Sequence, residues 1–225
     1  MVQVRGITVR RPMAYRASYA ADPSPEWSGR TSLAREWIDR GPPHGKSVYE
    51  LTNDPTIAAL DAVTSAASVR NVIRGALHRV LASLAATRGP MAWESLPLES
   101  LAAVAIPPAI QSCWVFVIRP GEATGAERHP NSHQRSLSLC GSGRFELHDG
   151  MGWRAFPLES HEVGLLTGRW VTIPPSTWHR LYAGESPWGM LSFHTVHAEQ
   201  LLEERPITEG TLAGPTSSRP YLGGD

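Results

Sequence analysis

The chain has few cysteines, no excess charge of either sign and no long apolar run. Its 225 residues include two cysteines, Cys113 and Cys140, which exclude a disulfide framework and are expected as free thiols. Lysine plus arginine and aspartate plus glutamate number 21 each, so no broad attraction to nucleic acid is predicted. The N-terminal residues lack the apolar core of a signal peptide, and no stretch has the length of a membrane span. We therefore expect a cytoplasmic protein without nucleic-acid or membrane partners.

The first half of the chain is predicted to be helical where it is regular. Apolar residues between Val69 and Leu84 recur at steps of three and four residues, which is typical of a helix with one buried face. Pro107 and Pro108 end the helical region. We predict that residues 1–108 form an N-terminal extension whose helices pack on the rest of the protein or on a partner subunit, with a homodimer as the expected assembly.

After residue 108 the sequence changes to short strands separated by turns. Such spacing is typical of a closed antiparallel architecture, either a sandwich or a barrel. We predict one β domain over residues 109–198 and an extended or disordered tail over 199–225, which is rich in glycine, proline, serine and threonine. The expected strands are 112–119, 127–129, 134–139, 143–147, 152–156, 170–173, 179–182 and 189–196.

Two segments of the β region carry side chains that bind metals. Glu127 and His129 are two residues apart, so on a strand they lie on one face, and His133 follows closely. A second segment, which begins at Gly168, ends in His179. Imidazole and carboxylate groups from neighbouring strands suit a divalent first-row metal, so the sequence predicts one metal site.

The two segments resemble the two motifs of the cupin superfamily. In the first, Gly121 is followed after five residues by Glu127-Arg128-His129, where the family has His-x-His, and Gly141 ends the motif. In the second, Gly168, Pro174 and His179 match, with Ser176 in place of glycine and Ala183 in place of asparagine. The resemblance implies a mainly β fold, the cupin-type double-stranded β-helix or jelly-roll barrel, with the metal inside. Together with the helical spacing described above, we predict this barrel with an N-terminal helical extension.

The family's glutamate position falls on His133 or on Gln134, depending on the spacing. If His133 faces inward, Arg135, Leu137 and Leu139 follow it and the serines face outward, which gives an apolar interior. If Gln134 faces inward, the serines line the barrel. We predict the first register, also because imidazole is a better metal ligand than an amide oxygen. The predicted metal ligands are Glu127, His129, His133 and His179.

Arg135 and His194 are the other candidate residues of the pocket. Two positions beyond His133, Arg135 is expected to face the same cavity, where its guanidinium could clamp a carboxylate or phosphate of the substrate. The alternative is a structural ion pair with an acid of the barrel such as Glu146. His194 lies near the end of the expected barrel and could line the pocket.

The leading functional hypothesis is a mononuclear metalloenzyme, an iron(II) oxidoreductase of the dioxygenase type that acts on a small organic acid. Nickel, manganese or zinc could occupy the same ligand set in place of iron. One alternative is a metal-dependent lyase or isomerase that works without oxygen. Another is a non-catalytic cupin that binds a metal or a metabolite.

Overall fold

Two helices precede the sheets in the computed structural model, which describes residues 54–102, 104–161, 165–208 and 210–221. Residues 1–53 of the predicted extension lie outside the described residues. Helix α3 (Pro55–Ser65) begins where the Asp54 carboxylate caps the Thr56 amide, with proline in the first turn. Helix α4 (Ala67–Ala86) buries one stripe of its surface, as the apolar spacing predicted, namely Val69, Ile73, Ala76, Val80 and Leu84.

Strands β1 to β8 form two facing sheets. The larger sheet has the order β1-β2-β8-β3-β6, and the smaller has β5-β4-β7. All their pairings are antiparallel, and residues 123–127 join the free edge of β7 through isolated bridges. This order is that of a jelly roll, and the predicted mainly β fold with N-terminal helices is confirmed. The strands are β1 (Met91–Ser95), β2 (Ser112–Ile118), β3 (Gln134–Cys140), β4 (Gly143–His148), β5 (Trp153–Leu158), β6 (Trp170–Ile173), β7 (His179–Ala183) and β8 (Trp188–His194).

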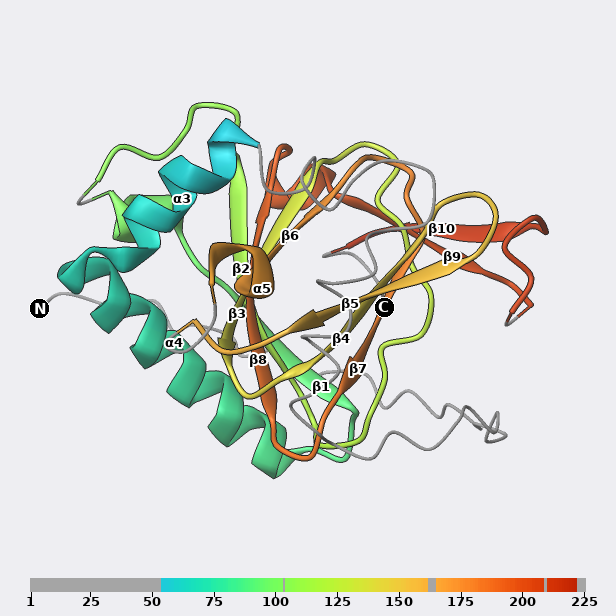
Figure 1. Ribbon diagram of the computed structural model, residues 1–225, viewed down its shortest axis with the longest axis horizontal. Helices are drawn as coiled ribbons and strands as arrows, with labels where there is room; N and C mark the ends of the chain where they lie inside the picture. The colour runs from blue at the N-terminus through green and yellow to red at the C-terminus, as the bar shows by residue number, and fades with distance from the viewer. Residues whose placement is uncertain (1–53, 103, 162–164, 209, 222–225) are drawn as a thin grey trace, which may run out of the picture.

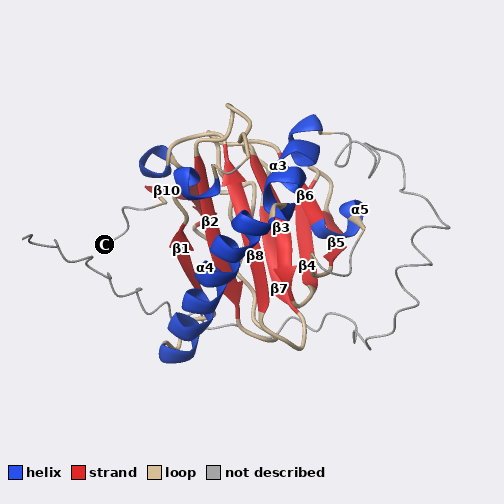
Figure 2. Ribbon diagram, turned by 90° about the vertical axis from the view of Figure 1, so that its left-hand side faces the viewer, coloured by secondary structure: helices blue, strands red, loops and turns tan. Residues whose placement is uncertain are grey.

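The large sheet is buried on both faces, so the protein has two apolar cores. Helices α3 and α4 lie across its outer face (Figure 2), where they pack against Val115 of β2, Leu137 of β3 and Phe193 of β8. The second core lies between the sheets and contains Phe145 of β4 and Trp188 of β8. Successive residues of a strand point to opposite faces, so odd-numbered residues of β2 and β8 meet the helices while even-numbered ones face the barrel.

The sheet and the site also use residues from both flanking segments. Strand β1 pairs with β2, so the sheet begins at Met91, before the predicted boundary at residue 108. The predicted tail contains β9 (Leu202–Pro206) and β10 (Thr216–Pro220), which form an antiparallel ribbon on the side away from α4 (Figure 1). The short helices are η1 (Leu98–Leu101), α5 (Leu166–Arg169) and η2 (Ala198–Gln200).

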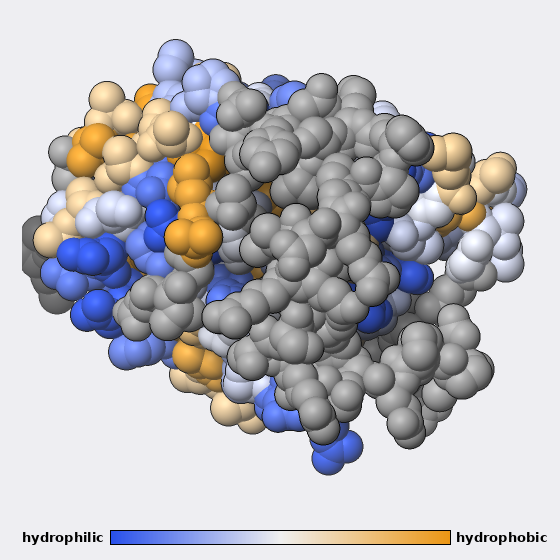
Figure 3. Space-filling view, in the orientation of Figure 1, coloured by the Kyte–Doolittle hydropathy of each residue, from blue (hydrophilic) through white to orange (hydrophobic). Residues whose placement is uncertain are grey.

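The exposed side of α4 is polar. Arg70, Arg74 and Arg79 are exposed there, and hydrophilic residues gather on the left of the face shown in Figure 3, where α4 lies in Figure 1. In the part of the chain that the structure describes, no helix is long and apolar enough to cross a membrane.

Candidate metal centre

Glu127, His129 and His179 come together where residues 127–129 run beside β7. Glu127 and His179 exchange two backbone hydrogen bonds, of 2.9 and 2.8 Å, so their side chains are held side by side. The donor atoms of the three residues all lie within 4.8 Å of one another. The Nε2 atom of His179 is 3.5 Å from Oε1 of Glu127, which is too long for a good hydrogen bond but suits two ligands of one ion.

Both imidazoles are oriented by backbone carbonyls. His129 Nδ1 is 2.8 Å from the Leu202 oxygen, and His179 Nδ1 is 3.0 Å from the Thr177 oxygen. Because a carbonyl only accepts, each Nδ1 must carry the proton, which leaves Nε2 as the free lone pair of the neutral ring. The Nε2 atom of His179 is buried and has no hydrogen-bond partner among the described residues. Metal-binding histidines are commonly oriented in this way.

The charges at the centre favour a cation. Burial alone would raise the pKa of Glu127, but the Arg205 guanidinium and then His179 outweigh it and hold the pKa at about 2. Burial, and then His179, lower the pKa of His129. The cluster therefore offers an ionised carboxylate at Glu127 and, at His129, an imidazole that loses its proton readily, the states in which these groups bind metals.

Arg205 of β9 connects the centre to the C-terminal ribbon. Its Nη2 pairs with Oε2 of Glu127, its Nη1 donates to the Thr124 carbonyl (2.9 Å) and its Nε to Glu203 (2.7 Å). Glu203 is buried and also accepts from Arg219 at 2.8 Å. The ribbon thus supplies a guanidinium that binds through all three nitrogens, fixes Oε2 of Glu127 and leaves Oε1 facing His179.

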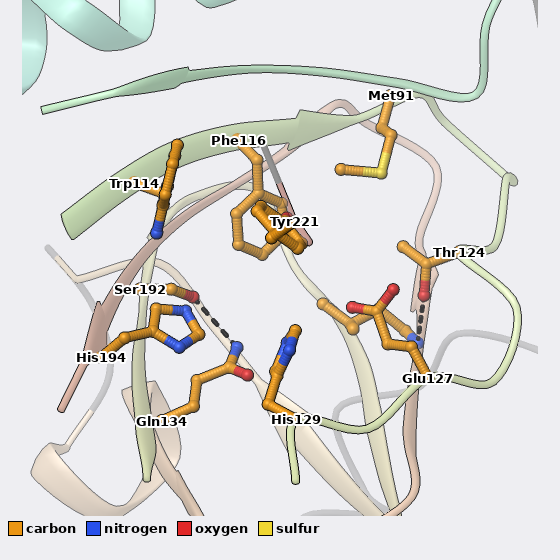
Figure 4. A pocket seen from close by; sticks show the side chains of 11 residues that line it. Met91, Trp114, Phe116, Thr124, Glu127, His129, Gln134, Ser192, His194 and Tyr221 are labelled. Carbon is orange, nitrogen blue, oxygen red and sulfur yellow. Dashed lines mark hydrogen bonds between the residues drawn. The ribbon is translucent and has the colours of Figure 1, made fainter. Parts of the chain in front are cut away.

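A small cavity of about 20 Å³ lies beside the cluster (Figure 4). Its walls include the rings of Trp114, Phe116 and Tyr221. Its polar wall is formed by Gln134, Ser192 and His194, with Ser192 accepting a hydrogen bond from Gln134 (Figure 4). A space of this size holds about one or two water-sized groups, so only a small part of a ligand fits inside.

His194 extends the histidine cluster from β8. Its ring centroid is 5.2 Å from that of His129, and its Nδ1 is 3.3 Å from the Ser132 hydroxyl. Burial, followed by His129 and His179, lowers its pKa well below the ordinary value. His194 is therefore a neutral imidazole at the cavity wall, next to the three grouped residues but not one of them.

The structure does not bring His133 into the cluster, so the predicted register of β3 needs correction. Gln134 faces the cavity, and Ser136 bonds to Ser192 inside the barrel at 2.7 Å. Leu137 packs instead under the helices. The prediction assumed one apolar core inside the barrel, whereas the helices create a second core outside it, and this outer core takes the leucines.

Arg135 also lies away from the cavity. Its guanidinium pairs with Asp54 at 2.6 Å and so ties β3 to the N-terminus of α3. Glu146, the acid suggested as its partner, pairs with Arg144 and Arg180. Because Arg135 follows Gln134 on the strand, it points to the helix side, and the expected substrate clamp is not at the site.

Two residues of the site, Arg205 and Tyr221, come from the segment predicted to be an extended tail. The weak signal for Arg205 was the run Leu201-Leu202-Glu203-Glu204-Arg205, in which the opposite charges Glu203 and Arg205 are two residues apart and so share one face of a strand. In the structure Glu204 of β9 pairs with Arg128, the residue between Glu127 and His129, at 2.6 Å. The site was predicted from the barrel alone, and its outer wall was therefore missed.

No protein-family model matches the chain, and no curated protein matches it. Several solved structures are similar to part of it. CapF from Staphylococcus aureus, a capsular polysaccharide assembling protein, matches with 13% identity over 51% of this chain and 30% of its own, with a TM-score of 0.40.

An oxalate oxidase matches with 14% identity over 48% of this chain and 52% of its own, with a TM-score of 0.38. The 11S globulin from Wrightia tinctoria matches with 16% identity over 57% of this chain and 31% of its own, with a TM-score of 0.42. The chain thus spans about half or less of these proteins' lengths. They are cupin-fold proteins, and the likeness is one of fold alone.

Proposed function

We propose that the protein is a mononuclear metalloenzyme in which Glu127, His129 and His179 hold one divalent metal ion. The observation that carries the proposal is the buried Nε2 of His179, which has no hydrogen-bond partner in the described part of the chain and lies 3.5 Å from Oε1 of the ionised Glu127. The proposed ligand set is thus smaller than the sequence predicted, since it omits His133.

The donor set supports iron(II) as the metal. Two histidines and one carboxylate form the set that non-haem iron oxygenases use, with the other positions left for substrate and oxygen. Bound iron(II) would supply the redox chemistry of an oxygenase. The chain's own residues would orient the ligands through backbone carbonyls, keep water out with Trp114, Phe116 and Tyr221, and admit a small organic acid.

His194 supports a second candidate, a metal-dependent lyase or isomerase. A neutral imidazole at the cavity wall can accept a proton from a bound substrate, as a general base does. This candidate predicts turnover without oxygen, whereas the first requires oxygen.

A cytoplasmic location and a homodimeric assembly stay predictions.

Metal analysis of two histidine variants tests the proposal. The protein is purified anaerobically, reconstituted with iron(II) and freed of excess metal, in parallel with His179→Ala and with His133→Ala as the matched control. About one equivalent is expected in the parent and in His133→Ala, with little in His179→Ala. Equal loss in both variants, or no metal in the parent, would contradict the proposed ligand set.

Oxygen consumption then separates the two candidates. The iron-loaded protein is given small organic acids with oxygen and without it. Metal-dependent oxygen uptake supports the oxygenase, whereas substrate loss under anaerobic conditions supports the lyase or isomerase.

A further inference from the structure

Two buried polar atoms in residues that line the cavity have no hydrogen-bond partner among the described residues. They are Nε1 of Trp114 and Oε1 of Gln134, whose residues are 2% and 4% exposed. Leaving such a group unpaired costs roughly 1 to 3 kcal/mol, so native proteins seldom do so without a reason. Both residues line the cavity beside Glu127 and His129 (Figure 4).

Each atom is held in place by its neighbours. The Trp114 ring packs edge-on against Trp93 and Tyr221, with centroids 5.3 Å from each. Gln134 donates from Nε2 to Ser136 (3.0 Å) and to Ser192 (3.2 Å). The amide nitrogen thus donates to the two serines, and the amide oxygen has no partner among the described residues.

The two atoms require different hydrogen-bonding groups in a ligand. The indole N–H needs an acceptor, and the amide oxygen needs a donor. A hydroxyl group can act in either way, as an acceptor for the indole N–H or as a donor to the amide oxygen, and its size suits a cavity of about 20 Å³. A carboxylate supplies only acceptors, and Arg205, which binds Glu203, Thr124 and Glu127, is not among the residues that line the cavity.

We propose that Trp114 and Gln134 form a subsite for a hydroxyl group, and that the ligand of this cavity is a small hydroxylated compound. The inference rests on the proposed function in one respect, since the metal would take the acid group while the subsite takes the hydroxyl. It narrows the substrate from small organic acids to those that carry a hydroxyl group.

The Trp114 indole proton gives a direct test by nuclear magnetic resonance. Protein labelled with ¹⁵N is prepared metal-free and zinc-loaded, and the Trp114 signal is assigned as the one missing in Trp114→Phe. Glycolate and acetate, which differ by one hydroxyl group, are titrated in parallel. Glycolate is expected to move the Trp114 signal selectively and to bind the zinc-loaded protein roughly tenfold or more tightly than acetate does.

Two variants and a control complete the experiment. Trp114→Phe and Gln134→Leu should each abolish the preference for glycolate, whereas Trp93→Phe should keep it, because Trp93 packs on Trp114 without lining the cavity. Equal binding of the two acids, or a preference that survives both substitutions, overturns the subsite.

The zinc content of the protein separates this inference from the proposed function. A protein that binds no zinc contradicts the metal site, and the metal-free titration then decides the subsite. A glycolate-selective shift of the Trp114 signal in that titration supports the subsite, and its absence overturns it.

Discussion

Ser176 has a left-handed backbone, with φ at 61°, and is the non-glycine residue in that region among the described residues. It stands where the second motif of the cupin superfamily has glycine, and its amide donates to the His129 carbonyl at 3.0 Å. A side chain in this conformation costs roughly 1 to 2 kcal/mol. The turn that leads into His179 thus has a left-handed conformation at Ser176, and the serine side chain makes that conformation costly.

Replacing Ser176 by glycine should stabilise the protein. Glycine relieves the strain of the left-handed backbone, but it also gives the unfolded chain more conformational entropy. The net effect should be an increase of about 0.5 to 1 kcal/mol in the free energy of unfolding. Urea unfolding measures the change. Ser176→Ala serves as control, since it keeps the Cβ atom and should give no gain; a similar gain in both variants would refute the account.

Arg135 should matter for stability and not for the metal. Its pair with Asp54 is largely buried, with side chains 8% and 14% exposed, so Arg135→Met should lower the free energy of unfolding by roughly 2 to 4 kcal/mol. Iron content should stay at the level of the parent.

The exposed pair between Arg79 and Glu94 is the matched control for Arg135. The Arg79 side chain is 63% exposed, so Arg79→Met should change the stability by less than about 1 kcal/mol. Loss of metal in Arg135→Met without loss of stability would restore the role in the site that was first expected.

At the scale of elements, the β9–β10 ribbon is held on the barrel by charged groups. Arg205 is the central one, because it contacts Glu127, Glu203 and the Thr124 carbonyl together. Burial alone would lower the pKa of Arg205, but Glu127 and Glu203 outweigh it and raise it. The ribbon is thus bound to the wall of the site through one guanidinium.

Arg205→Met should loosen this ribbon locally. Its removal leaves Glu203 and Glu127 without their shared partner, so backbone amides of β9 should exchange hydrogen at least about tenfold faster. Hydrogen exchange followed by mass spectrometry measures this. Arg219→Met should have a smaller effect because Arg219 is 52% exposed; equal effects would argue against a central role for Arg205.

For the whole molecule, the buried histidines make stability depend on pH. The pKa values of His129 and His194 are lowered in the folded protein, so below about pH 6.5 the unfolded chain binds more protons. The stability that the two neutral histidines contribute to the folded protein is complete above that pH and is lost as the pH falls. Each group contributes a slope of up to about 1.4 kcal/mol per pH unit.

Urea unfolding of metal-free protein between pH 7.5 and pH 5.5 should show this fall. His194→Gln should make the dependence shallower, whereas His78→Gln, on the exposed side of α4, should not change it. A parent protein that is equally stable at both pH values would contradict the expectation.

The local pattern of the sequence determined strands β2 to β8, the long helix and three of the candidate ligands. Val69 to Leu84 repeats with a helical period, and the short strands lie between turns, because burial of one face imposes these periods wherever the chain packs. Glu127 and His129 are two residues apart, so strand geometry alone places them together.

The tertiary structure decided which face of β3 looks inward. The alternation of side chains along a strand shows that Gln134 and Arg135 point to opposite sides, but it does not show which side faces the barrel interior. The apolar core beneath α3 and α4 decided this, because Leu137 packs there and Gln134 therefore faces the cavity. It also brought Arg205 and Tyr221 to Glu127, across 78 residues in the case of Arg205. Contacts between residues so far apart in the sequence depend on how the whole chain packs, and a local sequence pattern gives no information about that packing.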